Sequence, residues 1–173
     1  QGPDLSFILL PENILSEIVS TKIVYDLETA KTRYSEMDIY DNYAWMVHGY
    51  PDELSKKEGP HGSFYNVNVH YSMWYACLSI HQSDKGTGEL IDLVVPYIPE
   101  RSTINSFGGI SGGGLWSIPI VKEGDEISSF GKPFLSGVAF CEMIGSEEIE
   151  FIRCNGPKEL HTKYYRIIEQ HCV

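Results

Sequence analysis

The sequence predicts an all-β protein, an antiparallel barrel that ends in one C-terminal helix. Aromatic residues make up 12% of the chain, with 11 tyrosines, and there are 16 glycines, a composition typical of strands joined by many turns. Stretches with period-two alternation follow one another along the sequence, and the last stretch has a helical period instead. A run of strands followed by a terminal helix fits an antiparallel barrel.

The N-terminal part alternates between apolar and polar stretches. Residues 4–10 begin with an acid and continue as an aliphatic run, which predicts a buried strand. Residues 11–20 predict a short helix, because proline is tolerated in a first turn and four aliphatic side chains share one face. The polar residues 25–41 predict a surface connection. Residues 43–51 predict a strand ended by Gly and Pro, and residues 52–62 a charged, mobile loop.

The remainder predicts further strands and a final helix. Strands are expected at residues 65–81, 90–97, 134–143 and 149–154, with a turn-rich joint at 82–88 and a loop at 122–132. In residues 157–170 apolar side chains recur at helical spacing, so one face of that helix is apolar. The length suits one domain over residues 1–173.

The chain is acidic, with a net charge of -11 from 24 acidic and 13 basic residues. A nucleic-acid-binding protein usually carries the opposite sign or a basic stripe, and the sequence has neither. No apolar run approaches the roughly 18 residues that a membrane span requires. We therefore expect a cytoplasmic protein with neither nucleic-acid nor membrane partners. Gln1 is no natural initiator, so we expect the N-terminus to have been processed, trimmed or left out.

The cysteines give no sign of a metal site. Cys77, Cys141, Cys154 and Cys172 form no Cys-x-x-Cys pair and have no histidine at zinc-finger spacing. Cys141 and Cys154 could meet across neighbouring strands, but we favour free thiols in a reducing cytoplasm. The sequence implies no metal and no cofactor.

The most informative stretch is residues 108–116, Gly-Gly-Ile-Ser-Gly-Gly-Gly-Leu-Trp. Glycine has no Cβ, so the backbone around Ser111 can adopt positive φ and let another group approach closely. A nucleophilic serine needs such a turn, with its hydroxyl exposed and backbone N–H groups aimed at the developing oxyanion. A strand-like run follows, whereas the Gly-x-Ser-x-Gly elbow needs a helix. The alternative is a turn serine that hydrogen-bonds its own backbone.

The pattern Gly-x-Ser-Gly-Gly at residues 109–113 resembles the nucleophile loop of trypsin-like (chymotrypsin-fold) serine peptidases. Residues 4–10 resemble the family's triad aspartate and the aliphatic strand that follows it. Residues 134–140 resemble the strand behind the nucleophile, which forms one wall of the substrate cleft, and residues 160–164 resemble the family's C-terminus. The combined spelling is most similar to uncharacterised bacterial trypsin-like peptidase domains, so the resemblance implies a chymotrypsin-like barrel.

The resemblance also implies catalytic roles. Ser111 would be the nucleophile, Asp4 would orient a histidine, and the N–H groups of Gly109 and Ser111 would form the oxyanion hole. The family's histidine precedes its aspartate, and none of the six histidines here precedes Asp4. We read His48 as a strand-end residue. The chain therefore resembles the second barrel plus the last strand of the first, with the first barrel and the catalytic histidine mostly absent.

The resemblance places the substrate-binding positions at Asn105, Phe140 and Glu142. Asn105 lies six residues before the serine, at the floor of the family's specificity pocket. Glu142 on the cleft wall would favour a basic side chain, and its alternative is a solvated surface residue.

We expect a serine endopeptidase that cleaves a protein or peptide substrate through an acyl-enzyme. Its expected partners are that substrate and the missing N-terminal half or a regulatory protein. One alternative is a catalytically inactive trypsin-like fold that acts as a protein-binding module, and another is an esterase or acyl transferase. A lectin-like β-sandwich would need Trp45, Trp74 or Trp116 exposed in a groove, whereas we expect Trp116 to be largely buried.

Overall fold

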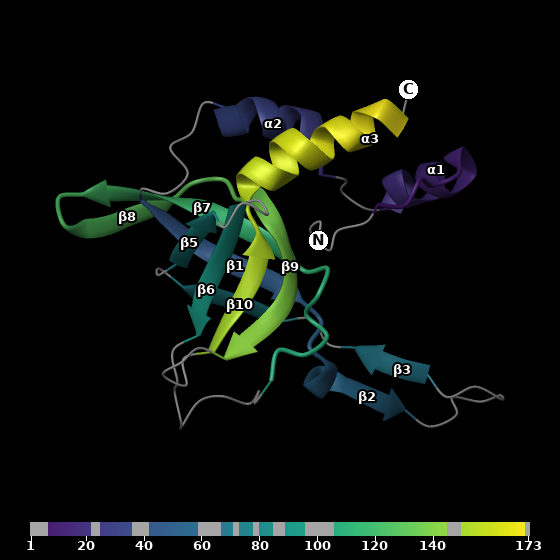
Figure 1. Ribbon diagram of the computed structural model, residues 1–173, viewed down its shortest axis with the longest axis horizontal. Coiled ribbons are helices and arrows are strands. Elements are labelled where there is room, and N and C mark those ends of the chain that lie inside the picture. Colours follow the sequence, from purple (N-terminus) through teal and green to yellow (C-terminus); the bar gives the residue numbers. More distant parts are fainter. Residues whose placement is uncertain are drawn as a thin grey trace.

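A computed structural model of the protein describes most of the chain (Figure 1). The described residues are 7–21, 25–35, 42–58, 67–70, 73–77, 80–84, 89–95, 106–144 and 150–171. Two predicted site residues, Asp4 and Asn105, lie outside them.

Most strands of the described chain belong to one antiparallel sheet with the order β4-β1-β7-β9-β10-β6-β5, and β8 pairs with β7. Its strands are β1 (Tyr43–Gly49), β4 (Met73–Cys77), β5 (Ile80–Asp84), β6 (Glu89–Val95), β7 (Gly114–Glu123), β8 (Glu126–Phe130), β9 (Phe134–Ile144) and β10 (Glu150–Asn155). β2 (Ser55–Glu58) and β3 (Val67–His70) form a separate pair. The short 3-10 turn η1 (Asp52–Leu54) directly precedes β2.

The sheet curls strongly without closing. β4 lies at one edge of the strand order, yet it contacts β6, which belongs to the other half. The two edge strands, β4 and β5, do not pair with each other in the described part of the chain. The prediction of a mostly antiparallel β protein with a C-terminal helix is confirmed, whereas the described strands do not form a closed barrel.

The core lies inside this curl, where alternate side chains of neighbouring strands meet. β1 contributes Trp45 and Val47, and the sheet partners contribute fully buried aliphatic and aromatic residues. These partners are Ile91, Leu93, Leu115, Phe134, Ala139, Ile152 and Cys154. Opposite Cys154 the β9–β10 register shifts, and Cys141 pairs with Arg153 instead. Cys141 and Cys154 are free thiols.

The predicted C-terminal helix is present as a π-helical segment, η2 (Glu159–Tyr164), that continues into α3 (Tyr165–His171). A second helix, α2 (Leu27–Ser35), lies beside it at one end of the sheet (Figure 1). A surface connection was predicted at residues 25–41. In the described part of that range all residues but Ala30 are exposed or half-buried, but the helix α2 was not predicted. Asp26 caps the helix through the Glu28 N–H, at 3.0 Å, and the Thr29 hydroxyl, and Ala30 is buried.

The N-terminal segment differs from its prediction. Residues 7–10 form no strand and are exposed, with Ile8 at 83% of its maximum, so the buried strand predicted there was wrong in the described part. The helix predicted next is present as α1 (Glu12–Thr21). None of its residues is buried.

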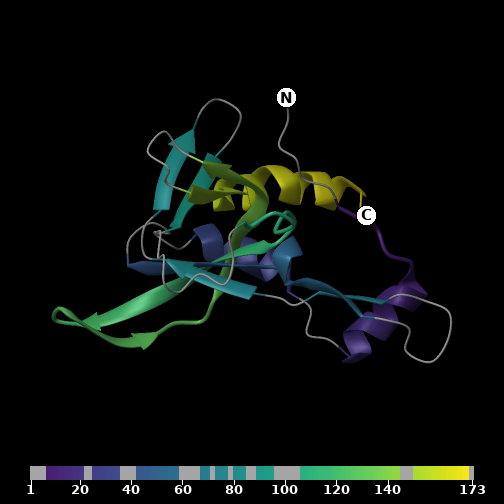
Figure 2. The same cartoon turned by 90° about the horizontal axis from the view of Figure 1, so that it is seen from below.

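Three predicted connections contain strands. The predicted loop at 52–62 contains η1 and β2, and the predicted joint at 82–88 includes the end of β5. The long strand predicted at 65–81 is divided between β3, β4 and the start of β5. The predicted loop at 122–132 is a β7–β8 hairpin that turns at Gly124, where φ is +66°, and it extends from the body as an arm (Figure 2). No helix in the described residues is long and apolar enough to cross a membrane.

Candidate functional site

Ser111 lies on two consecutive tight turns that share Ile110. The Ile110 N–H donates to the Phe107 carbonyl at 3.0 Å, and the Gly113 N–H donates to the Ile110 carbonyl at 2.9 Å. The third residue of each turn is a glycine with positive φ, Gly109 at +85° and Gly112 at +87°. A positive φ at this position is the requirement of a type II turn, which explains why glycine stands there. Ser111 is the second residue of the second turn and is exposed.

Buried contacts anchor the double turn to the sheet. The Ile110 side chain is only 1% exposed and lies against Gly49, where a Cβ would come within 2.6 Å of its Cγ1 atom. Gly113 in turn lies against the His48 and Ile110 carbonyl groups. β9 completes the anchor, because the Gly112 N–H donates to the Ala139 carbonyl and the Ala139 N–H to the Gly113 carbonyl, each at 2.8 Å.

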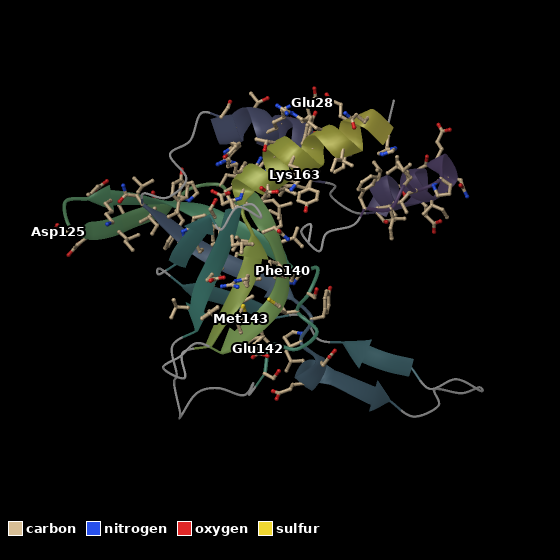
Figure 3. All side chains as sticks on the ribbon, in the orientation of Figure 1. Glu28, Asp125, Phe140, Glu142, Met143 and Lys163 are labelled. Atoms are coloured by element: carbon tan, nitrogen blue, oxygen red, sulfur yellow. The ribbon has the colours of Figure 1, made fainter. Side chains whose placement is uncertain are left out.

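Glu142 of β9 holds the start of the first turn. Its Oε1 accepts the Phe107 N–H at 2.9 Å, and its Oε2 accepts the Ser106 hydroxyl at 2.9 Å. The Ser106 Oγ also accepts the Gly108 N–H at 3.0 Å. Figure 3 shows Glu142 beyond Phe140 along β9. Both carboxylate oxygens of Glu142 are therefore engaged by the segment that leads into the serine turn.

Two amides of the double turn remain without an acceptor. Hydrogen bonds occupy the N–H groups of the other residues from 107 to 113, but in the described part of the chain the N–H groups of Gly109 and Ser111 have no acceptor. The Ser111 hydroxyl likewise has no hydrogen-bond partner among the described residues. The turn thus offers two unused donors and one free hydroxyl within three residues.

The directions of these two amides are fixed through their own peptide groups. The Gly108 carbonyl, which shares a peptide plane with the Gly109 N–H, accepts the Asp52 N–H at 2.7 Å. The Ile110 carbonyl, which shares a plane with the Ser111 N–H, accepts the Gly113 N–H. In a trans peptide the N–H points opposite to the C=O. Each hydrogen bond to a carbonyl therefore holds the neighbouring N–H outward in a defined direction.

The structure brings together part of the predicted site. Gly109 and Ser111 lie on the double turn, Glu142 of β9 is hydrogen-bonded to the residues that lead into this turn, and Phe140 is a half-buried residue of the same strand. Asp4 and Asn105 are not placed. The sequence did not predict the hydrogen bonds of Glu142 to Ser106 and Phe107, or the close approach of Asp52 to Gly109. The only sequence signal for the second contact is the Gly-Tyr-Pro-Asp run after β1, which predicts a turn but not its neighbour.

The described histidine side chains lie in different surroundings. His48, near the end of β1, pairs with Gly114 and has its ring 5.8 Å from that of Tyr50. His161 is 1% exposed, lies between the rings of Tyr34 and Phe134, and its Nε2 is 2.8 Å from the Leu135 carbonyl. Burial lowers the pKa of His161, so it is neutral at pH 7.

Two tryptophans named for the alternative sugar-binding groove are buried or half-buried. Trp45 is 1% exposed. Trp116 is half-buried, its indole nitrogen is inaccessible, and its ring packs edge-on against Tyr25. Trp74 lies in β4, but its side chain is outside the described ones. Among the described residues no group of three or more His, Cys, Asp or Glu side chains is arranged to hold a metal ion.

Comparison with known proteins gives no relative for this site: no protein-family model matches the chain, and no curated protein or solved structure matches it significantly.

Proposed function

We propose that this chain is the serine-bearing part of a trypsin-like serine endopeptidase. The observation that supports the proposal is the exposed hydroxyl of Ser111 beside the N–H groups of Gly109 and Ser111, none of which has a hydrogen-bond partner among the described residues. Such donors stabilise the oxygen that becomes negative when a hydroxyl attacks a carbonyl. An ordinary turn serine that caps its own backbone would have its hydroxyl engaged instead.

The proposed reaction is acyl transfer to Ser111. The Oγ bonds to the peptide carbonyl carbon while a histidine takes the hydroxyl proton, and the carbonyl oxygen becomes an oxyanion between the two amides. Collapse of this intermediate breaks the C–N bond, and the histidine gives its proton to the leaving amine. Water then releases the acid from the serine ester by the same steps. Losing one oxyanion donor typically costs about 2.7–4 kcal/mol of transition-state stabilisation.

The proposed base is none of the described histidines. His161 is buried, and its Nε2 lies at the Leu135 carbonyl, four residues along β9 from Ala139, which is hydrogen-bonded to the serine turn. We propose that a histidine upstream of Asp4 supplies the base and that Asp4 orients it, as the resemblance implies. The substrate would be a protein or peptide in the cytoplasm.

A fluorophosphonate probe tests the proposal on the protein with its natural sequence upstream of Gln1. We expect labelling of the wild type and of Ser129→Ala, a matched control at an exposed serine of β8, and no labelling of Ser111→Ala. Cleavage of a peptide library in preference to simple esters would separate a peptidase from an esterase. If no form is labelled, the enzyme proposal fails and the protein-binding module is favoured.

A further inference from the structure

We propose that Glu142 is the positioning residue of the serine turn and that it maintains the geometry in which the Gly109 and Ser111 amides stay free. The role of this geometry in catalysis rests on the proposed function. The hydrogen bonds that Glu142 makes to Ser106 and Phe107 do not depend on that function. Glu142 is half-buried and reaches across from β9 to a segment that precedes it by more than thirty residues. It therefore ties the start of the first turn to β9, whereas the bonds at Ala139 tie only the second turn to that strand.

The first step is the pair of hydrogen bonds at the Glu142 carboxylate, called the fork below. One oxygen accepts a backbone N–H, from Phe107, and the other accepts a hydroxyl, from Ser106. Both bonds measure 2.9 Å and involve a carboxylate, which makes hydrogen bonds of this kind stronger than neutral ones. Two bonds to adjacent residues fix the direction of the chain as well as its position.

The second step passes through Ser106. Because its hydroxyl proton points to Glu142, its oxygen is left to accept the Gly108 N–H at 3.0 Å. Gly108 is thus held at both ends, by Ser106 at its nitrogen and by Asp52 at its carbonyl. Its carbonyl shares a plane with the Gly109 N–H, so the fork at Glu142 restricts the direction of that amide.

The third step reaches Ser111. Phe107, whose N–H is held by Glu142, offers its carbonyl to the Ile110 N–H and so closes the first turn. The Ile110 carbonyl then closes the second turn and sets the direction of the Ser111 N–H. Without the fork, the first turn keeps its own hydrogen bond but loses its tie to β9.

Three variants separate positioning from general stability. Glu142→Ala removes both bonds of the fork. Glu142→Gln keeps two polar atoms there, because its oxygen can accept the Phe107 N–H while its NH₂ group donates to Ser106. Ser106→Ala removes the bonds of the Ser106 hydroxyl to Glu142 and Gly108 but keeps the bond between Glu142 and Phe107, and it is the milder change if Glu142→Ala does not fold. Glu126→Ala, at an exposed glutamate of β8, is the matched control.

The first measurement is backbone amide hydrogen exchange by NMR on this chain, which needs no activity. We expect Glu142→Ala to speed exchange at Phe107 and Gly108 by about tenfold or more, and Ser106→Ala to do so at Gly108. Glu142→Gln and Glu126→Ala should keep the wild-type protection. Unchanged exchange in both Glu142→Ala and Ser106→Ala overturns the proposal.

The second measurement is the kinetics of fluorophosphonate labelling on the protein with its natural upstream sequence. We expect Glu142→Ala to lower the maximal inactivation rate by about 10- to 100-fold, a typical effect of misplaced reacting groups, with little change in probe affinity. Glu142→Gln should restore most of the rate. Equal rates in wild type and Glu142→Ala overturn the positioning role. If the wild type is not labelled, the proposed function fails. The hydrogen-exchange measurement still tests whether Glu142 holds the serine turn in place.

Discussion

The backbone N–H of Asp52 donates a 2.7 Å hydrogen bond to the carbonyl of Gly108, and so connects the end of β1 to the turn that presents Ser111. The Asp52 side chain also lies close to Gly109, because a Cβ added at Gly109 would come within 2.7 Å of the Asp52 Cγ atom. Asp52 and Gly109 therefore fit together only while position 109 has no side chain. This relationship gives the first prediction.

Gly109→Ala should destabilise the protein more than Gly112→Ala does. Both glycines have nearly the same positive φ, so alanine carries a similar strain of about 1–2 kcal/mol at either position. A Cβ at Gly112 meets nothing within 4 Å, whereas one at Gly109 collides with Asp52, which adds about 1–3 kcal/mol. Urea unfolding of the two variants measures the difference. Equal losses of free energy would show that Asp52 does not press on Gly109.

Gly137→Ala is expected to be among the most destabilising single substitutions in the sheet. A Cβ there would overlap the Asn155 carbonyl oxygen of β10 and come within 3.3 Å of a Leu115 methyl group. Backbone atoms cannot turn aside, so β9 and β10 must separate, at a cost of about 3 kcal/mol or more. The measurement is the midpoint of urea unfolding, with Gly124→Ala in the exposed hairpin as the control for glycine replacement. A loss no larger than that control contradicts the packing described.

The protein should lose stability as the pH falls below the ordinary His pKa of 6.5, through His161. Burial lowers its pKa in the folded state, so between the two pKa values the unfolded chain binds a proton that the folded chain does not. The stabilisation is complete above pH 6.5 and is lost progressively until the folded pKa is reached. The groups that face the ring are Tyr34 of α2, Phe134 and the Leu135 carbonyl of β9.

Glu159 and Tyr164 lie on the same helical segment as His161 and are also buried. Unfolding measured from pH 7.5 to 5 should therefore give a slope in the wild type that His161→Phe reduces. His171→Phe, at an exposed histidine, serves as the control. An identical slope in His161→Phe would assign the pH dependence to other groups.

Arg153→Lys should destabilise the sheet although the charge is kept. Arg153 meets Asp92 through two bonds of 2.7 Å, from Nε and Nη2, and the Asp92 side chain is only 9% exposed. Lysine cannot supply two parallel donors, so a loss of about 1 kcal/mol is expected. Lys122→Gln, at an exposed lysine of β7, should cost less than about 0.5 kcal/mol. Thermal unfolding compares the two losses.

The spacing of apolar residues along the sequence predicted the strands and the helix whose apolar side chains are buried in the core. β1, β6, β9, β10 and the C-terminal helix fall close to their predicted ranges, because their apolar residues face one core. The missed helix α2 is mostly polar and buries Ala30 alone, and its start depends on the cap at Asp26. The exposed residues 7–10 have the composition of a buried strand, but composition does not tell whether a partner strand is present.

The site was predictable only in its short-range part. The glycines around Ser111 predict tight turns, and the structure has positive φ at Gly109 and Gly112. The long-range contacts were not predictable, because Glu142 and Asp52 reach the turn from distant parts of the sequence and no local pattern encodes their register. The resemblance implies a position of Glu142 on the wall of a cleft, and it gave no sign that the carboxylate would bind Ser106 and Phe107.

The position of Ile110 beneath Gly49 has a consequence for how the serine segment responds to its surroundings. An aliphatic side chain that is withdrawn from water has no charge for dissolved ions to screen. Concentrated salt should therefore leave the contact between Ile110 and Gly49 intact. Ile110→Ala, in contrast, opens a cavity and should lower the free energy of unfolding by about 2–5 kcal/mol. The shape around the hydroxyl thus depends at this point on the Ile110 Cγ1 methylene group and the Gly49 Cα, which carries no side chain.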